Sequence, residues 1–310
     1  MNELITGDNR RSLKLMGCDF EFVIAEESAT DEALEHAIAE VRRIEKLLTE
    51  FSECSETSLI NTHAGIRPIQ VSDEMYSLIK RCKEIWKFTQ GAFDITSGAV
   101  RKLYNFKGHG FELPDASALE EALSRTGSDK IMLGSKNSVY LSQQGMRIGF
   151  GAIGKGYAAD MAKRKLIRLG IRNAVINASG DLTAFGRRTD GSMWKVGIAD
   201  PNEPSRIIAW LPVPYGSIAT SGDYEQYFES EGVRYSHNID PKSGKPVTGI
   251  KSVTIVSSSA ELSDALATAV TVMGVEVGLD FIEQLPGVHA LVITDKNKIY
   301  TSQHLKFERA

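Results

Sequence analysis

The sequence has few cysteines and no long apolar run, and each absence excludes a class of protein. The three cysteines, Cys18, Cys54 and Cys82, are widely spaced and odd in number, which fits neither a disulfide framework nor a zinc site. The N-terminal stretch lacks the long apolar core of a secretory signal, and no segment reaches the length of a membrane span. We therefore expect reduced thiols in a cytoplasmic chain, or a periplasmic or membrane-anchored chain from which an export segment has been removed.

Basic residues are not in excess either. The 310 residues include 36 Lys and Arg against 40 Asp and Glu, which gives a net charge of −4, and the basic residues are dispersed. A nucleic-acid-binding surface needs a basic patch or stripe, so we expect no nucleic-acid partner. The hydrophobic fraction of 42% and the charged fraction of 25% are those of a globular protein.

Helix-like and strand-like segments are mixed along the chain without a strict βαβ alternation. Apolar residues recur at helical spacing in residues 30–51 and 72–93, whereas residues 19–26 alternate as a strand does. From about residue 150, a glycine-rich turn and a helix are followed by successive strand-like runs. This order predicts an α+β fold with largely antiparallel sheets and packed helices.

Two oxygen-bearing side chains share one face of the helix predicted for residues 258–274. Asp264 and Thr268 are one helical turn apart, so the carboxylate and the hydroxyl point the same way. Oxygen ligands of this kind suit a hard cation. Alternatively, Asp264 is an N-terminal acid favoured by the helix dipole, and Thr268 is a half-buried core residue.

A glycine-rich turn, FGAIGKGYAAD, occupies residues 150–160 just before another predicted helix. Glycine lets the backbone approach a ligand closely, and a helix N-terminus favours phosphate. Lys155 adds a positive charge there. The spacing matches neither a Walker A loop nor the G-x-G-x-x-G motif, and a tight turn with an exposed lysine is equally compatible with it.

Three loops carry side chains that could take part in chemistry. His237 precedes two turn signals, where it is available as a proton carrier near neutral pH, or serves as a capping or surface histidine. Phe93 and Asp94 follow a helix stop at Gly91 and could face a ring-shaped ligand, although Phe93 fits the core equally well. Residues 220–228 could face a phosphate group or form a plain turn.

Taken together, nine segments resemble the ApbE family, the Mg-dependent FAD:protein FMN transferases, and they occur in the family's order. The resemblance extends from about Met16 to at least Gly274, which is most of the chain. It implies the family's α+β, T-fold-like architecture, with residues 1–15 as an N-terminal extension and residues 16–310 as one ApbE-like domain. The segments are MGCDFEF, SETSLIN, QGAFDIT, GAIGKGYAAD, INASGDL, WKVGIADP, IATSGDYEQYF, SHNIDPKSGKPV and SDALATAVTVMG.

The resemblance implies an enzyme that binds FAD, transfers its FMN half to a Thr or Ser hydroxyl of a target flavoprotein, and releases AMP. Mg²⁺ is then the cofactor, FAD the substrate and the acceptor flavoprotein the partner. Two other functions fit the same residues: a Mg-dependent FAD pyrophosphatase, in which water replaces the protein hydroxyl, and an FAD-binding module without catalysis. The presence of His237 and of both metal-binding side chains argues against the module.

The resemblance also implies roles for individual residues. Asp264 and Thr268 match the family's magnesium ligands, with the backbone carbonyl of Ala152 as a third. His237 matches the histidine that acts in transfer. The positions that line the flavin nucleotide are matched by Met16, Phe51, Ala92, Phe93, Asp94, Lys155 and Asn238.

The chain departs from the family pattern at two positions. The family commonly has an acidic residue at the start of the glycine-rich turn, where this chain has Gly149. The loss of a nucleotide contact is expected from this change. In the first motif, Cys18 replaces the usual threonine, and a thiol fills similar space but forms weaker hydrogen bonds.

Overall fold

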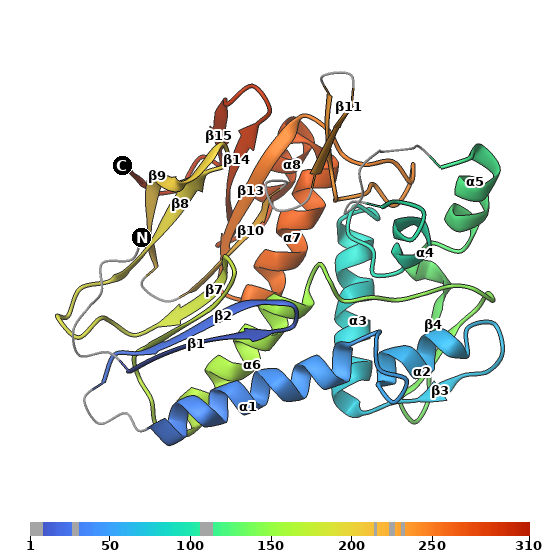
Figure 1. Cartoon of the computed structure of the whole chain (residues 1–310), viewed down its shortest axis with the longest axis horizontal. Coiled ribbons are helices and arrows are strands. Elements are labelled where there is room, and N and C mark those ends of the chain that lie inside the picture. The colour runs from blue at the N-terminus through green and yellow to red at the C-terminus, as the bar shows by residue number, and fades with distance from the viewer. Residues whose placement is uncertain (1–8, 27–30, 106–113, 214–215, 223–226, 231–232) are drawn as a thin grey trace.

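The computed structural model describes residues 9–26, 31–105, 114–213, 216–222, 227–230 and 233–310 (Figure 1). Its centre is an eight-stranded sheet in the order β1-β2-β6-β7-β10-β13-β14-β15, in which each strand is antiparallel to its neighbours. The predicted α+β fold with largely antiparallel sheets is confirmed. The strands are β1 (Asn9–Leu15), β2 (Cys18–Ile24), β6 (Ala174–Ala178), β7 (Asp181–Phe185), β10 (Gly216–Gly222), β13 (Ile250–Ser257), β14 (His289–Thr294) and β15 (Ile299–Thr301).

The first described strand, β1, forms one edge of this sheet. It pairs with β2 along its whole length, from Asn9 opposite Ile24 to Leu15 opposite Cys18. The two-residue turn between them has positive φ at both positions, 52° at Met16 and 77° at Gly17, as a tight hairpin requires. Residues 9–15, which the resemblance places in an N-terminal extension, are thus paired within the main sheet.

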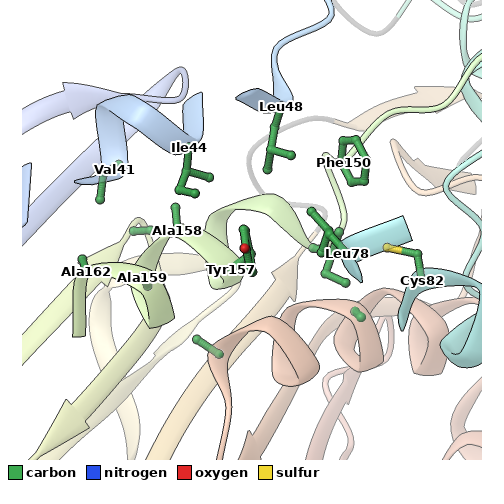
Figure 2. Packing of buried hydrophobic residues seen from close by; sticks show 14 of the residues in the cluster. Val41, Ile44, Leu48, Leu78, Cys82, Phe150, Tyr157, Ala158, Ala159 and Ala162 are labelled. Carbon is green, nitrogen blue, oxygen red and sulfur yellow. The ribbon is translucent and has the colours of Figure 1, made fainter. Parts of the chain in front are cut away.

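Three long helices cover one face of the sheet (Figure 1): α1 (Asp31–Leu48), α6 (Gly154–Arg168) and α7 (Ala260–Met273). α6 and α7 pack on the sheet and on each other, and α1 packs on α6. Figure 2 shows Val41 and Ile44 of α1 pointing toward Ala158 of α6, and all three side chains are fully buried. The small side chain at this position of α6 lets the two helices approach closely.

The opposite face of the sheet is covered by a second, three-stranded antiparallel sheet. It has the order β16-β9-β8, with β8 (Trp194–Asp200), β9 (Glu203–Val213) and β16 (Glu308–Arg309). Leu182 of the main sheet and Leu211 of β9 belong to one buried cluster that joins the two layers. Sheet-on-sheet packing of this kind buries alternate residues of each strand.

Most of the remaining elements lie beside the α1–α6–α7 layer (Figure 1). A small antiparallel sheet has the order β3-β5-β4, and β11 pairs with β12 in a hairpin. The elements are α2 (Glu56–Thr62), β3 (Ile69–Gln70), α3 (Asp73–Phe88), α4 (Gly98–Arg101), α5 (Ala116–Ser124), η1 (Ser128–Lys130), β4 (Ile131–Gly134), β5 (Ser138–Leu141), β11 (Tyr227–Ser230), β12 (Val233–Ser236) and α8 (Val275–Glu283).

The three cysteines differ in their exposure to solvent. Cys18 is half-buried, Cys54 is exposed and Cys82 is buried, and none of them forms a disulfide in the described part of the chain. Among the helices of that part, none combines the length and the apolar character needed to span a membrane.

Candidate active site

A cleft of about 410 Å³ is lined by the start of α6, one face of α7 and the loops that follow α1, α3 and β12. It brings together residues that are far apart in the sequence. Met16 and Phe93 are not among its lining residues. The predicted site residues that do line it are Phe51, Ala92, Asp94, Ala152, Lys155, His237, Asn238, Asp264 and Thr268.

The glycine-rich turn and α7 meet at a very close backbone contact. A Cβ atom at Gly156 would lie 2.1 Å from the carbonyl oxygen of Ala260, so only glycine fits this position. The backbone N–H of Gly156 donates a hydrogen bond of 3.1 Å to Oδ2 of Asp264. The start of α6 is therefore fixed against the residue predicted to bind the metal.

The acid in the first turn of α7 is Glu261, not Asp264. Asp160 of α6 accepts hydrogen bonds from the N-cap hydroxyl of Ser259, at 2.7 Å, and from the backbone N–H of Glu261, at 3.1 Å. The Glu261 carboxylate also pairs with Arg81 of α3 at 2.6 Å. The interpretation of Asp264 as an N-terminal acid is therefore wrong, because the helix-dipole effect fades beyond the first turn.

Asp264 and Thr268 both line the cleft, as their spacing on a helix predicts. The Asp264 side chain is almost fully buried, whereas Thr268 is half-buried. Burial, and after it the negative charge of nearby Asp181, raise the pKa of the Asp264 carboxyl to about 7. A carboxylate held under these conditions favours a neighbouring positive charge.

Lys155 forms an ion pair with Asp181, a carboxylate buried at the start of β7. Burial alone would lower the pKa of Lys155, but the charges of Asp181 and Asp264 outweigh it and raise that pKa above its ordinary value. The ammonium group therefore stays charged at neutral pH. It lies at the cleft wall, where it can donate hydrogen bonds to a bound anion.

The donor set at this end of the cleft fits a magnesium ion. Asp264, Thr268 and Ala152 line the cleft, and their carboxylate, hydroxyl and backbone carbonyl groups offer the oxygen atoms that magnesium prefers. When both carboxylates are ionised, the combined negative charge of Asp181 and Asp264 exceeds the positive charge of Lys155, and a bound cation would balance the difference. Within the described ranges, no group of three or more His, Cys, Asp or Glu side chains could hold a metal. The predicted set contains only one such side chain, so the remaining ligands would be neutral oxygens, water and phosphate.

His237 follows β12, and its loop is held by backbone hydrogen bonds. The N–H of Ser236 donates to Val247 O, and the N–H of Val247 donates to Asn238 O, both at 2.9 Å. The side-chain amide of Asn238 donates to Oγ of Ser221 at 3.0 Å. The guanidinium of Arg101 donates to the carbonyl oxygen of His237 at 3.4 Å. The backbone around His237 is thus held by contacts from three segments, and His237 is one of the residues that line the cleft.

Asp94, Phe93 and Met16, which are predicted to bind the nucleotide, also form contacts that stabilise the fold. Both carboxylate oxygens of Asp94 accept hydrogen bonds, from the hydroxyl groups of Thr96 and Ser128 at 2.7 Å and from their backbone N–H groups. Phe93 is fully buried in the main core, which agrees with the alternative noted for it. Met16 packs against the same core, and its N–H donates to Oε1 of Glu45 at 2.8 Å.

Comparison with known proteins identifies the family. The model of the ApbE family matches residues 16–292. The chain belongs to the ApbE family. A FAD:protein FMN transferase of Klebsiella pneumoniae (strain 342) is 33% identical over 283 residues, which cover 89% of this chain and 88% of that protein. One of Treponema pallidum (strain Nichols) is 33% identical over 289 residues, covering 87% of this chain and 79% of that protein. The crystal structure of the ApbE protein from Thermotoga maritima has a TM-score of 0.86 and 32% identity, over 96% of this chain and 97% of that one.

The sequence motifs did not indicate two charged residues that line this ApbE-family cleft, Glu50 and Arg101, or the buried Asp181 that pairs with Lys155. Asp181 lies within the quoted segment INASGDL, but only the fold shows that its carboxylate reaches Lys155. Glu50 directly precedes Phe51, and Arg101 follows the QGAFDIT segment. Their positions beside family motifs were the available signal.

The two departures from the ApbE pattern differ in their distance from the cleft. Cys18 starts β2 and is half-buried, and it is not a lining residue. Gly149 does line the cleft, just before the turn that carries Ala152 and Lys155. The missing side chain at position 149 therefore changes the surface that a ligand meets.

Proposed function

We propose that the protein transfers FMN from FAD to a Thr or Ser hydroxyl of an acceptor flavoprotein and releases AMP, with Mg²⁺ as cofactor. The names of its curated relatives support FMN transfer from FAD to a protein. The observation that carries the proposal is that Lys155, Asp264, Thr268 and His237 line one cleft. Together they supply the charge balance and the proton acceptor that phosphoryl transfer needs.

The end of the cleft near α7 would hold the diphosphate of FAD. Asp264, Thr268 and the Ala152 carbonyl would bind Mg²⁺, which when bound offsets negative charge on the phosphate oxygens. Lys155 contributes a second positive charge from the start of α6, where backbone N–H groups also favour phosphate. Asp181 keeps the ammonium of Lys155 charged and in place.

His237 is the proposed proton acceptor. A Thr or Ser hydroxyl is a poor nucleophile at neutral pH and needs a base to take its proton. The hydroxyl oxygen forms a bond to the phosphorus of the FMN half, and the bond from that phosphorus to the oxygen of AMP breaks. The proton passes from the hydroxyl to the imidazole, and AMP leaves with the bonding electron pair.

The test is to incubate the protein with FAD, Mg²⁺ and a candidate acceptor flavoprotein, and then to measure the acceptor by mass spectrometry. An added FMN on a Thr or Ser, with one AMP released for each, supports the proposal. Free FMN and AMP without acceptor modification would instead indicate a pyrophosphatase. Intact FAD after prolonged incubation would contradict both reactions.

A further inference from the structure

The carboxylate of Glu50 lies where a side chain on Gly149 would project. A Cβ atom built on Gly149 would have Oε1 of Glu50 as its contact, at 3.3 Å. Both residues line the candidate active site, although Glu50 comes from the loop after α1 and Gly149 from the segment before α6. An acidic group is therefore present at this part of the cleft wall, carried by a different segment of the chain.

The backbone does not require glycine at position 149. Gly149 is not among the glycines with positive φ, so other residues can adopt its conformation. Its N–H donates to Ile95 O at 2.8 Å, and this bond is available to any residue except proline. A larger residue at position 149 is therefore limited by the space that the Glu50 side chain occupies, and not by the backbone conformation.

Glu50 is held with one oxygen engaged and the other turned toward Gly149. Its Oε2 accepts from Nη2 of Arg147 at 3.1 Å, while Oε1 is the atom nearest the Gly149 position. The charge of Glu50 also acts on Arg101, which lines the same cleft. About a third of the Glu50 side chain is exposed, 34% of its surface, so a ligand in the cleft can reach it.

A carboxylate in this place accepts hydrogen bonds from neutral donors of a ligand. FAD offers such donors in both halves: hydroxyl groups on the ribityl chain and ribose, and N–H groups on both ring systems. Hydrogen bonds to an ionised acceptor are stronger than neutral ones. The ion pair with Arg147 limits the movement of the Glu50 side chain.

We propose that Glu50 is a specificity-determining residue for FAD, which supplies from the α1 loop the acidic contact that the ApbE pattern places at position 149. The inference rests on the proposed function for the identity of the nucleotide. Because Glu50 lies beside Gly149, this wall of the cleft carries a carboxylate although position 149 has none. The expected nucleotide contact is relocated rather than lost.

The experiment measures the dissociation constant for FAD, from quenching of flavin fluorescence in the presence of Mg²⁺. We expect Glu50→Ala to weaken binding about tenfold, and Gly149→Asp alone to weaken it because two carboxylates would repel each other. The double variant Glu50→Ala/Gly149→Asp should recover most of the lost affinity. Glu53→Ala is the matched control, because Glu53 is an exposed acid of the same loop that does not line the cleft.

Two results would overturn the inference: unchanged affinity in Glu50→Ala, or a double variant no better than Glu50→Ala alone. Circular dichroism and thermal unfolding of each variant check that the fold is retained. Competition by FMN and by AMP, compared between wild type and Glu50→Ala, shows which half of FAD meets the carboxylate. A wild-type protein that binds FAD but never modifies an acceptor would refute the proposed function alone, because the binding comparison does not depend on transfer.

Discussion

The backbone N–H of Gly156, near the start of α6, donates a 3.1 Å hydrogen bond to the Asp264 carboxylate on α7. This bond joins the glycine-rich turn to the helix face that carries Asp264 and Thr268. The absence of a side chain at position 156 makes it possible, because a Cβ there would lie 2.1 Å from Ala260 O. The segments proposed to face the phosphate and the metal are thus packed together as one unit.

The first prediction concerns this contact. Gly156→Ala forces α6 and α7 apart, and we expect the free energy of unfolding to fall by about 1–3 kcal/mol, the usual cost of overpacking. Transfer activity should fall with it, because Asp264 loses its position. Urea unfolding measures the first effect and acceptor modification the second.

Gly151→Ala is the control for stability. A Cβ at Gly151 would meet no heavy atom within 4 Å in the described part of the structure. The free energy of unfolding of Gly151→Ala should therefore stay close to that of the wild type. Equal stability of the two variants would contradict the packing argument.

The second prediction concerns the pH dependence of the metal-free protein. The pKa of Asp264 is raised from 3.8 to about 7, so its contribution to stability is complete below pH 3.8 and is lost as pH rises through about 7. Asp264→Asn removes this buried charge. We expect it to raise the Tm of the metal-free protein at pH 8 by about 3 °C, and by less at pH 5.

Added Mg²⁺ should reverse the order of thermal stability of the wild type and Asp264→Asn. The wild type should gain thermal stability with Mg²⁺ and FAD, because ligands that bind only the folded state stabilise it. Asp264→Asn, lacking the charged ligand, should show little gain. An equal Mg²⁺-dependent shift in both proteins would remove Asp264 from the metal site.

The third prediction separates binding from transfer. His237→Ala should bind FAD nearly as well as the wild type, while transfer slows by about 10²–10⁴-fold, the range expected for loss of a general base. Flavin fluorescence quenching measures binding, and the rate of acceptor modification measures transfer. Unchanged transfer would remove His237 from the mechanism.

The fourth prediction ranks the cysteines by reactivity. Cys54 is exposed, whereas Cys82 is fully buried and burial raises the pKa of its thiol well above the ordinary value. At pH 8, a thiol reagent should modify Cys54 quickly and Cys82 only after unfolding. Peptide mapping of the alkylated protein reads out both sites, and rapid labelling of Cys82 in the folded protein would show that its core opens.

Local patterns predicted much of the fold and one face of the site. The apolar period of residues 30–51 corresponds to α1 at Asp31–Leu48. The i, i+4 spacing of Asp264 and Thr268 brought both residues to the cleft, because helix geometry alone decides which residues share a face.

These local patterns could not predict contacts between segments that are distant in the sequence. The pairing of Lys155 with Asp181 and the approach of Glu50 to Gly149 depend on how distant segments pack. Phe93 shows a second limit, because an aromatic residue after a helix looks the same in sequence whether it faces a ligand or the core. Its neighbour Ala92 lines the cleft, while Phe93 itself is buried.

The most direct test is a crystal structure of the protein with FAD and Mn²⁺ in place of Mg²⁺, with the ion located by anomalous scattering. We expect a single peak bonded to the Asp264 carboxylate, the Thr268 hydroxyl and oxygens of the FAD diphosphate. A peak elsewhere, or a diphosphate bound away from α7, would contradict this expectation.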